Sequence, residues 1–448
     1  MVATHFWESP FDSGPIPASD SVFDVIIVGG GPAGSAAASY LAMEGKKVLL
    51  IEKAIWPRDK ICGDAVGGKS LLHLAELGVK TRIEKNPHFR VISIIFGAPN
   101  GAIVNIPLPK EVVESREAGY AMPRILFDRM LFERAAELVR ENDGAVVQGA
   151  VVKNIIHNDG KDPGPGSGDQ RVITGVEVRL ADDEYHWKAT VLIGAGGYTC
   201  PVARELVKVT YAETMIDKTH YCGGWREYWS GVKGCEDDEG AIELHFLKDS
   251  PGYFWLFPIG GGVVNVGVGV VLADLDKQKL KLRDLQAKII ADNPRFSDSR
   301  MVEGSGRGWQ LPFGSPRKGA MLQPRRAFGN GVLLIGDAAS LVDPFSGEGI
   351  GNALLSAKVA VNSIIENGGV DIESGNAYQQ ALWNILGDEL TNSYKLQRLT
   401  KRAWLLNWVI KKAARKPKIQ KLFTDMIASK EAQSKLHSKW YLLRTFLF

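Results

Sequence analysis

The segment Val22–Glu52 constrains the fold of this chain more than any other stretch. An apolar run leads into Gly29, Gly31 and Gly34, spaced G-x-G-x-x-G, and an Ala-rich stretch then leads to a second apolar run that ends at Glu52. This pattern predicts a strand, a tight turn, a helix and a second strand. The helix N-terminus would offer free N–H groups to a pyrophosphate, and Glu52 would accept hydrogen bonds from a ribose. We therefore expect a dinucleotide-binding unit.

Composition narrows the class of protein. The chain has 448 residues, 45% of them hydrophobic and 23% charged, which is typical of a folded protein with two or three domains. A net charge of +3 gives no support to nucleic-acid binding. The four cysteines form no C-x-x-C pair, so we expect a reduced, cytoplasmic setting and no structural metal site. No run reaches about 18 apolar residues, and residues 1–21 read as a leader rather than a signal peptide.

The apolar patterns predict an α/β fold, α+β overall. Strands are expected at 91–106, 145–157, 171–180 and 185–196, with a helix over 124–142 and an exposed hairpin loop over 158–170. From 210 to 315, alternating aromatic and β-branched runs predict an antiparallel sheet inserted into a Rossmann-type domain. The predicted boundaries are 1–21 for the leader, 22–90, 120–208 and 320–375 for the nucleotide-binding domain, 91–119 and 209–319 for a substrate-binding domain, and 376–448 for a helical C-terminal region.

Two later segments resemble parts of the same nucleotide site. The first, 191–197 (VLIGAGG), is similar to the V-I-G-A-D-G of the flavoprotein superfamily typified by p-hydroxybenzoate hydroxylase, with Gly196 where Asp is usual. The second, 336–354 (GDAASLVDPFSGEGIGNAL), resembles its G-D-A and Pro-x-x-G-x-G segments. The resemblance implies an FAD-binding domain. A helix N-terminus at the second segment would stabilise negative charge on reduced flavin.

The glycine motif and the resemblance together imply a set of cofactor residues. Asp337 would bind the ribityl or ribose part of FAD, and Arg124 matches a family arginine near the diphosphate, the alternative being an ordinary surface arginine. The expected FAD-binding residues are Gly29, Gly31, Pro32, Ala33, Gly34, Glu52, Lys53, Cys62, Gly63, Arg124, Gly336, Asp337, Gly347, Gly349 and Ile350, with Pro344 in the turn.

Two further motifs resemble geranylgeranyl reductases. KICGDAV, at 60–66, looks like their K-x-C-G loop, where the cysteine sits near the flavin, and PGYFWLFPIGGGVVNVGVGV, at 251–270, resembles their Y-x-W-x-F-P and glycine-rich strand. On this match the substrate side is lined by Tyr253, Trp255, Phe257, Pro258, Gly267 and Gly269. An aromatic strand suits a long apolar ligand, although plain core packing is the alternative. The W-x-W-x-I-P motif of flavin halogenases is matched less well, since its first Trp and its Ile are absent.

The resemblance implies an FAD-dependent reductase that hydrogenates C=C bonds of geranylgeranyl (isoprenoid) chains of lipids, diphosphates or a pigment precursor, by hydride from the reduced flavin N5. Cys62 is the catalytic candidate, as a proton donor or as packing beside the flavin. Tyr221, His220 and Tyr253 are alternative donors. A flavin-dependent monooxygenase or halogenase is the rival activity, and a non-catalytic flavin- or lipid-binding protein is the second rival.

The sequence does not decide the electron donor or whether the protein contacts a membrane. The chain has no second G-x-G-x-x-G unit, so a ferredoxin-like protein or transiently bound NAD(P)H would reduce the flavin. The basic stretch 395–421 predicts either a helix on the cytoplasmic face of an anionic membrane or a helix packed on its own domain. Its cations are Lys401, Arg402, Lys411, Lys412, Arg415, Lys416 and Lys418, beside Trp404, Leu405, Leu406, Trp408 and Ile410.

Overall fold

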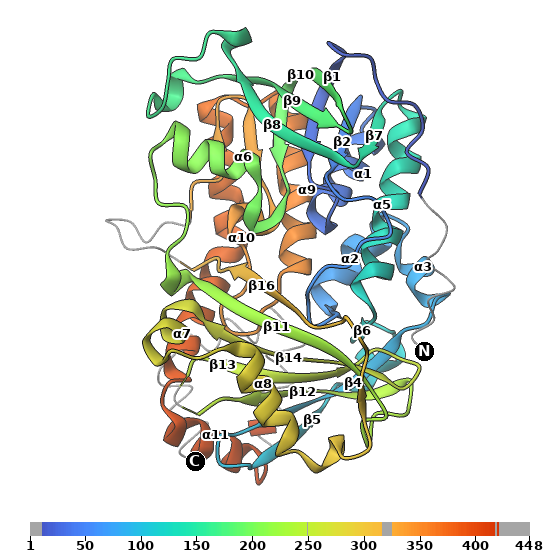
Figure 1. Cartoon of the computed structure of the whole chain (residues 1–448), viewed down its shortest axis with the longest axis vertical. Helices are drawn as coiled ribbons and strands as arrows, with labels where there is room; N and C mark the ends of the chain where they lie inside the picture. The colour runs from blue at the N-terminus through green and yellow to red at the C-terminus, as the bar shows by residue number, and fades with distance from the viewer. Residues whose placement is uncertain (1–10, 249, 316–324, 417–418, 421–448) are drawn as a thin grey trace.

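Two sheets, one above the other in Figure 1, form the body of the molecule. The structure is a computed structural model, and it describes residues 11–248, 250–315, 325–416 and 419–420. The first ten residues of the predicted leader, Lys418 and the last part of the predicted helical region, 421–448, lie outside the described residues.

The first sheet builds the predicted nucleotide-binding unit. Its order is β17–β18–β10–β1–β2–β7. The strands are β1 Val22–Val28, β2 Val48–Glu52, β7 Ala145–Gln148, β10 Asp183–Gly194, β17 Phe328–Gly329 and β18 Val332–Leu334. Because β1 is parallel to β2 and β10, and β10 is parallel to β18, the carboxyl ends of these strands share one edge. Antiparallel strands β8 Ala150–His157 and β9 Ile173–Leu180 join the sheet through β10.

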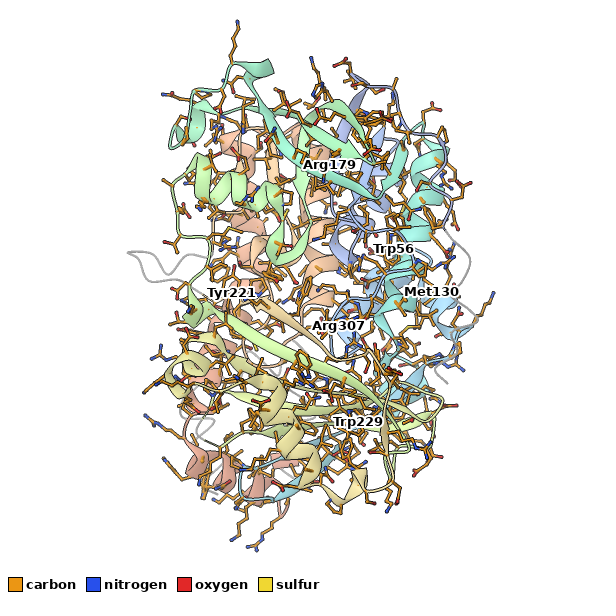
Figure 2. All side chains as sticks on the ribbon, in the orientation of Figure 1. Trp56, Met130, Arg179, Tyr221, Trp229 and Arg307 are labelled. Carbon is orange, nitrogen blue, oxygen red and sulfur yellow. The ribbon has the colours of Figure 1, made fainter. Side chains whose placement is uncertain are left out.

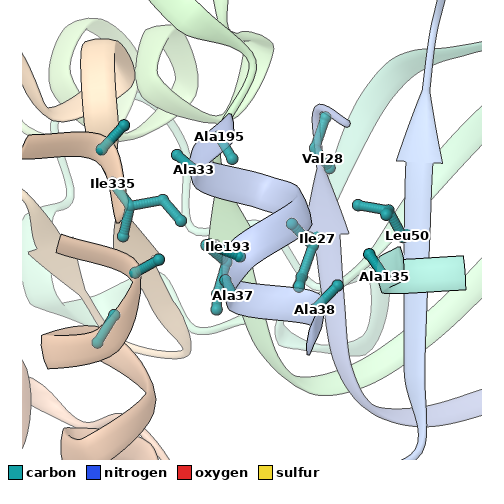
Figure 3. Close-up of a cluster of buried hydrophobic side chains, with 14 of the residues drawn as sticks. Ile27, Val28, Ala33, Ala37, Ala38, Leu50, Ala135, Ile193, Ala195 and Ile335 are labelled. Carbon is teal, nitrogen blue, oxygen red and sulfur yellow. The ribbon is translucent and has the colours of Figure 1, made fainter. Parts of the chain in front are cut away.

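Helix α1, Pro32–Met43, lies deep in the molecule because its side chains are small. It contacts both α5, Arg124–Glu141, and α9, Ile350–Asn367. Figure 3 shows Ala37 and Ala38 on α1 next to Ile27 and Ile193 of the sheet. A Cβ added to Gly34 would lie only 1.8 Å from the carbonyl oxygen of Gly29, so the close packing of helix on strand requires glycine there.

The second sheet has the order β15–β11–β14–β13–β12–β4–β6–β3, with β16 on β11 and β5 on β4. Its strands are β3 Ala65–Gly67, β4 Phe89–Gly97, β5 Ile103–Pro107, β6 Gly119–Ala121, β11 Tyr221–Ser230, β12 Glu239–Phe246, β13 Gly252–Pro258, β14 Val263–Val271, β15 Arg300–Met301 and β16 Arg307–Pro312. All its pairs are antiparallel except β12 with β4. One face packs Phe254, Leu256 and Val266 against Ile290 of α8, Leu282–Ala291.

The structure confirms the predicted fold class and corrects details of it. Helix α5 stands where 124–142 was predicted, and α10, Ile372–Leu399, and α11, Ala403–Ala413, belong to the predicted helical region. The run 91–106 is two strands, β4 and β5, and the run 145–157 breaks at Gly149, where φ is +72°. Helices α7, Leu272–Gln278, and α8 were missed because only strands were expected between 210 and 315.

The remaining short helices are α2 Gly68–Glu76, α3 Lys80–Glu84, α4 Lys110–Glu114 and α6 Pro201–Ala203. The loop predicted at 158–170 joins the hairpin of β8 and β9. Strands β3 and β6 pair in the second sheet, although β3 lies inside the range 22–90 predicted for the first domain and β6 spans the predicted boundary at 119–120. The domain boundaries stay a prediction. Within the described part of the chain, no helix has the length and apolarity needed to cross a membrane.

Candidate active site

Three segments of the chain meet at the carboxyl edge of the first sheet. The turn after β1 lies against the turn after β10, since a Cβ added to Gly29 would lie 2.6 Å from the carbonyl oxygen of Ala195. The segment after β18 reaches the same place, because a Cβ on Gly336 would lie 2.9 Å from the Cβ of Ala33. The structure therefore brings together the three segments in which the sequence predicted parts of one nucleotide site.

The N-terminus of α1 at this junction is free to hold an anionic group. Its N-cap residue is Gly31, which has no side chain to cap the first turn, and Pro32 follows as the first helical residue. The N–H groups of the first turn and the positive end of the helix dipole thus remain available. This arrangement fits the diphosphate of a dinucleotide such as FAD. Helix α9 also starts from a glycine, Gly349, and Ile350 is its buried first residue.

Glu52 ends β2 in a fixed position beside the glycine turn. Its Oε2 accepts a hydrogen bond from the N–H of Gly30, and its Oε1 accepts one from the N–H of Ala54, both at 2.9 Å. Each carboxylate oxygen keeps a further lone pair for another donor. Lys53, by contrast, is exposed. The roles of Glu52 and Lys53 in binding a cofactor stay predictions.

The loop Arg58–Asp64 crosses from the nucleotide site to the second sheet, and we call it the crossing loop. Arg58 places its Nε 3.6 Å from Oε2 of Glu52, and Lys60 places its Nζ 3.4 Å from Oδ2 of Asp337. In Figure 2, Trp56, just before the loop, lies a little above the middle of the molecule. Two cations that the sequence analysis did not assign therefore lie beside two predicted cofactor residues.

Arg124 is buried rather than on the surface. It donates two hydrogen bonds to the carboxylate of Asp128, at 2.7 and 3.0 Å, and is 2% exposed. Burial alone would lower the pKa of Arg124, but Asp128 and then Cys62 raise it above its usual value, so the guanidinium stays charged. Cys62 is thus near enough to this guanidinium to affect its pKa. The structure thus brings together two predicted residues, while their contact with a cofactor stays a prediction.

Of the residues predicted to line the substrate, Tyr253, Trp255, Phe257, Gly267 and Gly269 share one face of the second sheet, whereas Pro258 is on the opposite face. Trp255 and Gly267 are cross-strand partners on β13 and β14, and Phe257 is the partner of Asn265 in the next row. A Cβ on Gly267 would lie 2.0 Å from the indole of Trp255, so the ring covers that glycine. Phe257 meets the crossing loop, because a Cβ on Gly63 would lie 2.8 Å from its ring. The aromatic face and the K-x-C-G loop are therefore in contact.

Tyr253 joins this aromatic face to the turn before α9. Its hydroxyl donates a hydrogen bond to the carbonyl oxygen of Ser346 at 2.6 Å. A Cβ on Gly347 would lie 2.6 Å from the same hydroxyl, and the φ of Gly347 is +77°, so glycine is needed there for two reasons. Glu348 accepts a hydrogen bond from the N–H of Gly351 at 2.6 Å, and burial raises its pKa. The sequence analysis did not assign Glu348.

Other predicted residues have structural partners that explain their identity. Pro258 ends β13 and is buried. A Cβ at Gly196, where the family has Asp, would lie 3.3 Å from Sγ of Cys200, which is a tight contact. Of the alternative proton donors, Tyr221 donates its hydroxyl to the carbonyl of Met215, and the ring of His220 bonds the hydroxyl of Ser315.

Sequence reasoning missed a buried polar group on the same sheet face. Asn265 of β14 donates a hydrogen bond to the carbonyl oxygen of Cys62 at 2.7 Å and accepts one from Nε1 of Trp255 at 2.8 Å. On β11, Arg226 pairs with Asp59, and Tyr228 donates to Oδ2 of Asp64 at 2.6 Å. Polar residues within apolar strands were the available signal, since buried polar groups require partners.

Comparison with known proteins assigns the family. Residues 22–362 match the family model described as an FAD binding domain. A menaquinone reductase from Mycolicibacterium smegmatis is 30% identical over 361 residues, covering 78% of both chains. Digeranylgeranylglycerophospholipid reductase 1 from Methanococcoides burtonii is 28% identical over 380 residues, covering 83% of this chain and 82% of that protein.

Solved structures show the same fold. A geranylgeranyl bacteriochlorophyll reductase-like protein from Thermoplasma acidophilum superposes with a TM-score of 0.73 at 20% identity, covering 93% of this chain and 99% of that one. A myxobacterial chondrochloren halogenase gives a TM-score of 0.65 at 18% identity, covering 95% of each chain. The fold therefore serves both reductases and halogenases. By its sequence match, the chain belongs to the FAD binding domain family and is an FAD-dependent oxidoreductase.

Proposed function

We propose that this protein reduces C=C bonds in the isoprenoid chain of a geranylgeranyl lipid, diphosphate or pigment precursor. The observation that carries the proposal is the contact between the aromatic face of β13 and the crossing loop, at Phe257 and Gly63. An apolar aromatic surface beside the flavin suits a long hydrocarbon chain and excludes water. The curated relatives, a menaquinone reductase and digeranylgeranylglycerophospholipid reductases, agree with a reductive activity.

The chain's residues have the following proposed roles. The N-terminus of α1 binds the FAD diphosphate, with Arg58 beside it, since a Cβ on Gly31 would lie 3.6 Å from Nη2 of Arg58. Glu52 and Asp337 bind sugar and ribityl hydroxyls. Lys53, Gly347 and Gly349 complete the cofactor contacts.

Bound FAD supplies the hydride for one carbon of the double bond. A proton must reach the other carbon, and we propose the Cys62 thiol as its source, with the Cys62 carbonyl oxygen held by Asn265. Tyr253 is less suited, because its hydroxyl proton is already donated to Ser346 and burial raises its pKa. Tyr253, Trp255, Phe257, Pro258 and Gly267 position the chain and keep water out.

The test is an anaerobic single turnover. The holoprotein is reduced with dithionite, a geranylgeranyl lipid or geranylgeranyl diphosphate is added, and the flavin absorbance is followed near ~450 nm, where oxidised flavin absorbs. We expect reoxidation and a product heavier by two hydrogens for each flavin oxidised. The same lipid with fully saturated chains is the matched control and should leave the flavin reduced.

Two results would contradict the proposal. If the flavin stays reduced until air is admitted and the product then carries oxygen or halogen, the protein is a monooxygenase or halogenase, as the shared fold allows. If FAD is retained and no compound reoxidises it, the protein is a binding protein. Menaquinone is included as an alternative substrate, because one relative is named for it.

We also propose an external electron donor, either a ferredoxin-like protein or NAD(P)H. The proposal rests on the sequence, which has a single G-x-G-x-x-G unit. Replacing dithionite by NADPH or by a reduced ferredoxin in the same anaerobic cell distinguishes the two. Flavin bleaching by one donor within the turnover time identifies it, and bleaching by neither contradicts both.

Finally, we propose that α11 contacts an anionic membrane surface, where such lipids reside. Trp404, Trp408 and Lys411 are exposed and recur at the spacing of one helical face, and exposed Arg415 follows the end of the helix. The opposite face of α11 is buried, with Ile410 packed near β4 and β5. The sequence left two alternatives for this stretch, a helix on a membrane and a helix packed on its own domain. One face of α11 packs on the protein, and the other carries tryptophans beside cations, so α11 has a face suited to each alternative.

A further inference from the structure

The crossing loop turns alternate side chains toward two different surfaces. Arg58 and Lys60 face carboxylates of the nucleotide site. Asp59 and Asp64 face the second sheet instead. Asp59 lies between Arg58 and Lys60 and points the other way, and Asp64 reaches the sheet from a left-handed backbone conformation, with φ at +66°. The loop is therefore held between the FAD site and the sheet, and each side has its own set of partners.

The sheet partners of the loop come from two adjacent strands. Tyr228 of β11 and Asn265 of β14 are direct cross-strand partners, and Arg226 lies two residues before Tyr228 on the same face. The guanidinium of Arg226 lies 4.1 Å from the centre of the Tyr228 ring, which fixes their relative position. Three side chains on rigid strands thus hold Asp59, the Cys62 carbonyl and Asp64, and we call these contacts the sheet anchors.

Asp64 is an anchor point with a pKa near neutral pH. It is fully buried, and burial raises its pKa to about 6, against the lowering effects of Arg226, Tyr228 and Asn265. Asp59 also acts on it and raises its pKa. Within the described residues, Oδ1 of Asp64 and Nε and Nη1 of Arg226 have no hydrogen-bond partner, so their charges act on each other with little screening.

We propose that Arg226, Tyr228 and Asn265 are positioning residues that hold the crossing loop against the FAD site, and that ionised Asp64 is required for tight FAD binding. The inference rests on the cofactor roles proposed above for this loop. A loop fixed on its sheet side loses less conformational freedom when it closes on the cofactor, so affinity rises without any new contact to FAD. An ionised carboxylate accepts a shorter and stronger hydrogen bond from Tyr228 than a protonated one.

The test measures FAD affinity of the holoprotein without any substrate. The holoprotein is diluted, and the fluorescence of the FAD that it releases gives the dissociation constant. Tyr228→Phe removes one hydroxyl, and we expect the Kd for FAD to rise about tenfold, the effect of losing one hydrogen bond to a charged group. The matched control is Tyr211→Phe, because Tyr211 donates to Asp169 at 2.7 Å in the connection between β8 and β9, which is not part of the crossing loop, and we expect the Kd to stay within about twofold of wild type.

A second variant tests the role of charge. Asp64→Asn should weaken FAD binding at pH 7.5, and its Kd should vary little between pH 5 and pH 8, whereas the wild type should bind FAD several times more tightly at pH 7.5 than at pH 5. The double variant Asp64→Asn/Tyr228→Phe should bind FAD no more weakly than the weaker-binding single variant, because both changes affect the same Tyr228–Asp64 contact.

Two outcomes would overturn the inference. One is an equal effect of Tyr228→Phe and Tyr211→Phe on FAD affinity, which would mean that the Asp64 bond serves stability alone. The other is an unchanged pH dependence in Asp64→Asn. Because no isoprenoid is present in these measurements, failure of the proposed reductase activity would leave both readouts intact, and the two ideas fail separately.

Discussion

Gly267 shows how the absence of a side chain shapes the aromatic face. The indole of Trp255 lies over this glycine, and its Nε1 reaches Asn265 from that position. We expect Gly267→Ala to push the ring away, break the Trp255–Asn265 hydrogen bond and lower the free energy of unfolding by about 1–3 kcal/mol. Urea unfolding measures this change.

The matched control for this substitution lies one strand away. Gly224 of β11 is on the same sheet face, and a Cβ there would meet no atom nearer than 4.0 Å. Gly224→Ala should therefore leave the free energy of unfolding within about 0.5 kcal/mol of wild type. Equal losses in the two variants would show that the indole does not cover Gly267 in solution.

The raised pKa of Asp64 also predicts how the free energy of unfolding depends on pH. The pKa of Asp64 is about 6 in the folded protein, and an unfolded aspartate titrates near ~3.9. Between these values the folded state binds the proton more tightly, so this group's contribution to the free energy of unfolding falls as pH rises from ~4 to ~6 and is constant above that. From pH 4 to pH 7 the wild type should lose up to about 3 kcal/mol relative to Asp64→Asn.

Urea unfolding of both proteins at the two pH values gives this difference directly. Other carboxylates titrate in the same range, but they are common to both proteins and cancel when the two are compared. A constant difference between wild type and Asp64→Asn would place the pKa of Asp64 at its unfolded value.

Among the helices and strands, α11 leads to a direct prediction of membrane binding. Trp404 on its exposed face is 66% exposed, Lys411 shares that face, and exposed Arg415 follows the end of the helix. We expect the full protein to float with vesicles that contain anionic lipid, and Trp404→Ala to reduce the bound fraction several-fold, because an interfacial tryptophan and nearby cations add their binding energies. Flotation with neutral vesicles should recover little protein.

Leu72 of α2 provides the control for that experiment. It is also 66% exposed, yet it lies on a different helix. Leu72→Ala should float as the wild type does. An equal loss for Leu72→Ala and Trp404→Ala, or binding that ignores lipid charge, would remove α11 as the membrane contact.

At the scale of the whole molecule, the sequence predicts what is local and misses what joins distant segments. The unit from β1 to β2 was predicted well because its glycines, apolar runs and acidic end lie within about 30 residues of each other. The parallel pairing of β12 with β4 joins segments about 150 residues apart, and no local pattern encodes it. Helices α7 and α8 were not predicted, because strands precede and follow them in the sequence.

The residues of the candidate site also divide into those that could be predicted from local motifs and those that could not. Its glycines, Glu52, Asp337 and the aromatic strand could be found because they occur in motifs with recognisable spacing. The partners of Arg226 and Asn265 could not, since a polar residue in a strand indicates only that it needs a partner, and the folded structure shows that this partner is the crossing loop. Their partners Asp59 and Cys62 are more than 160 residues earlier in the chain.

The strand order also sets when the molecule can be completed during synthesis. The first sheet needs β18, and the cofactor junction needs the turn at Gly336, so neither exists until about three quarters of the chain has left the ribosome. The second sheet likewise waits for β12 to join β4. Until then, the strands translated first have unpaired edges, and a cell making this protein must shield a long nascent chain before FAD can enter it.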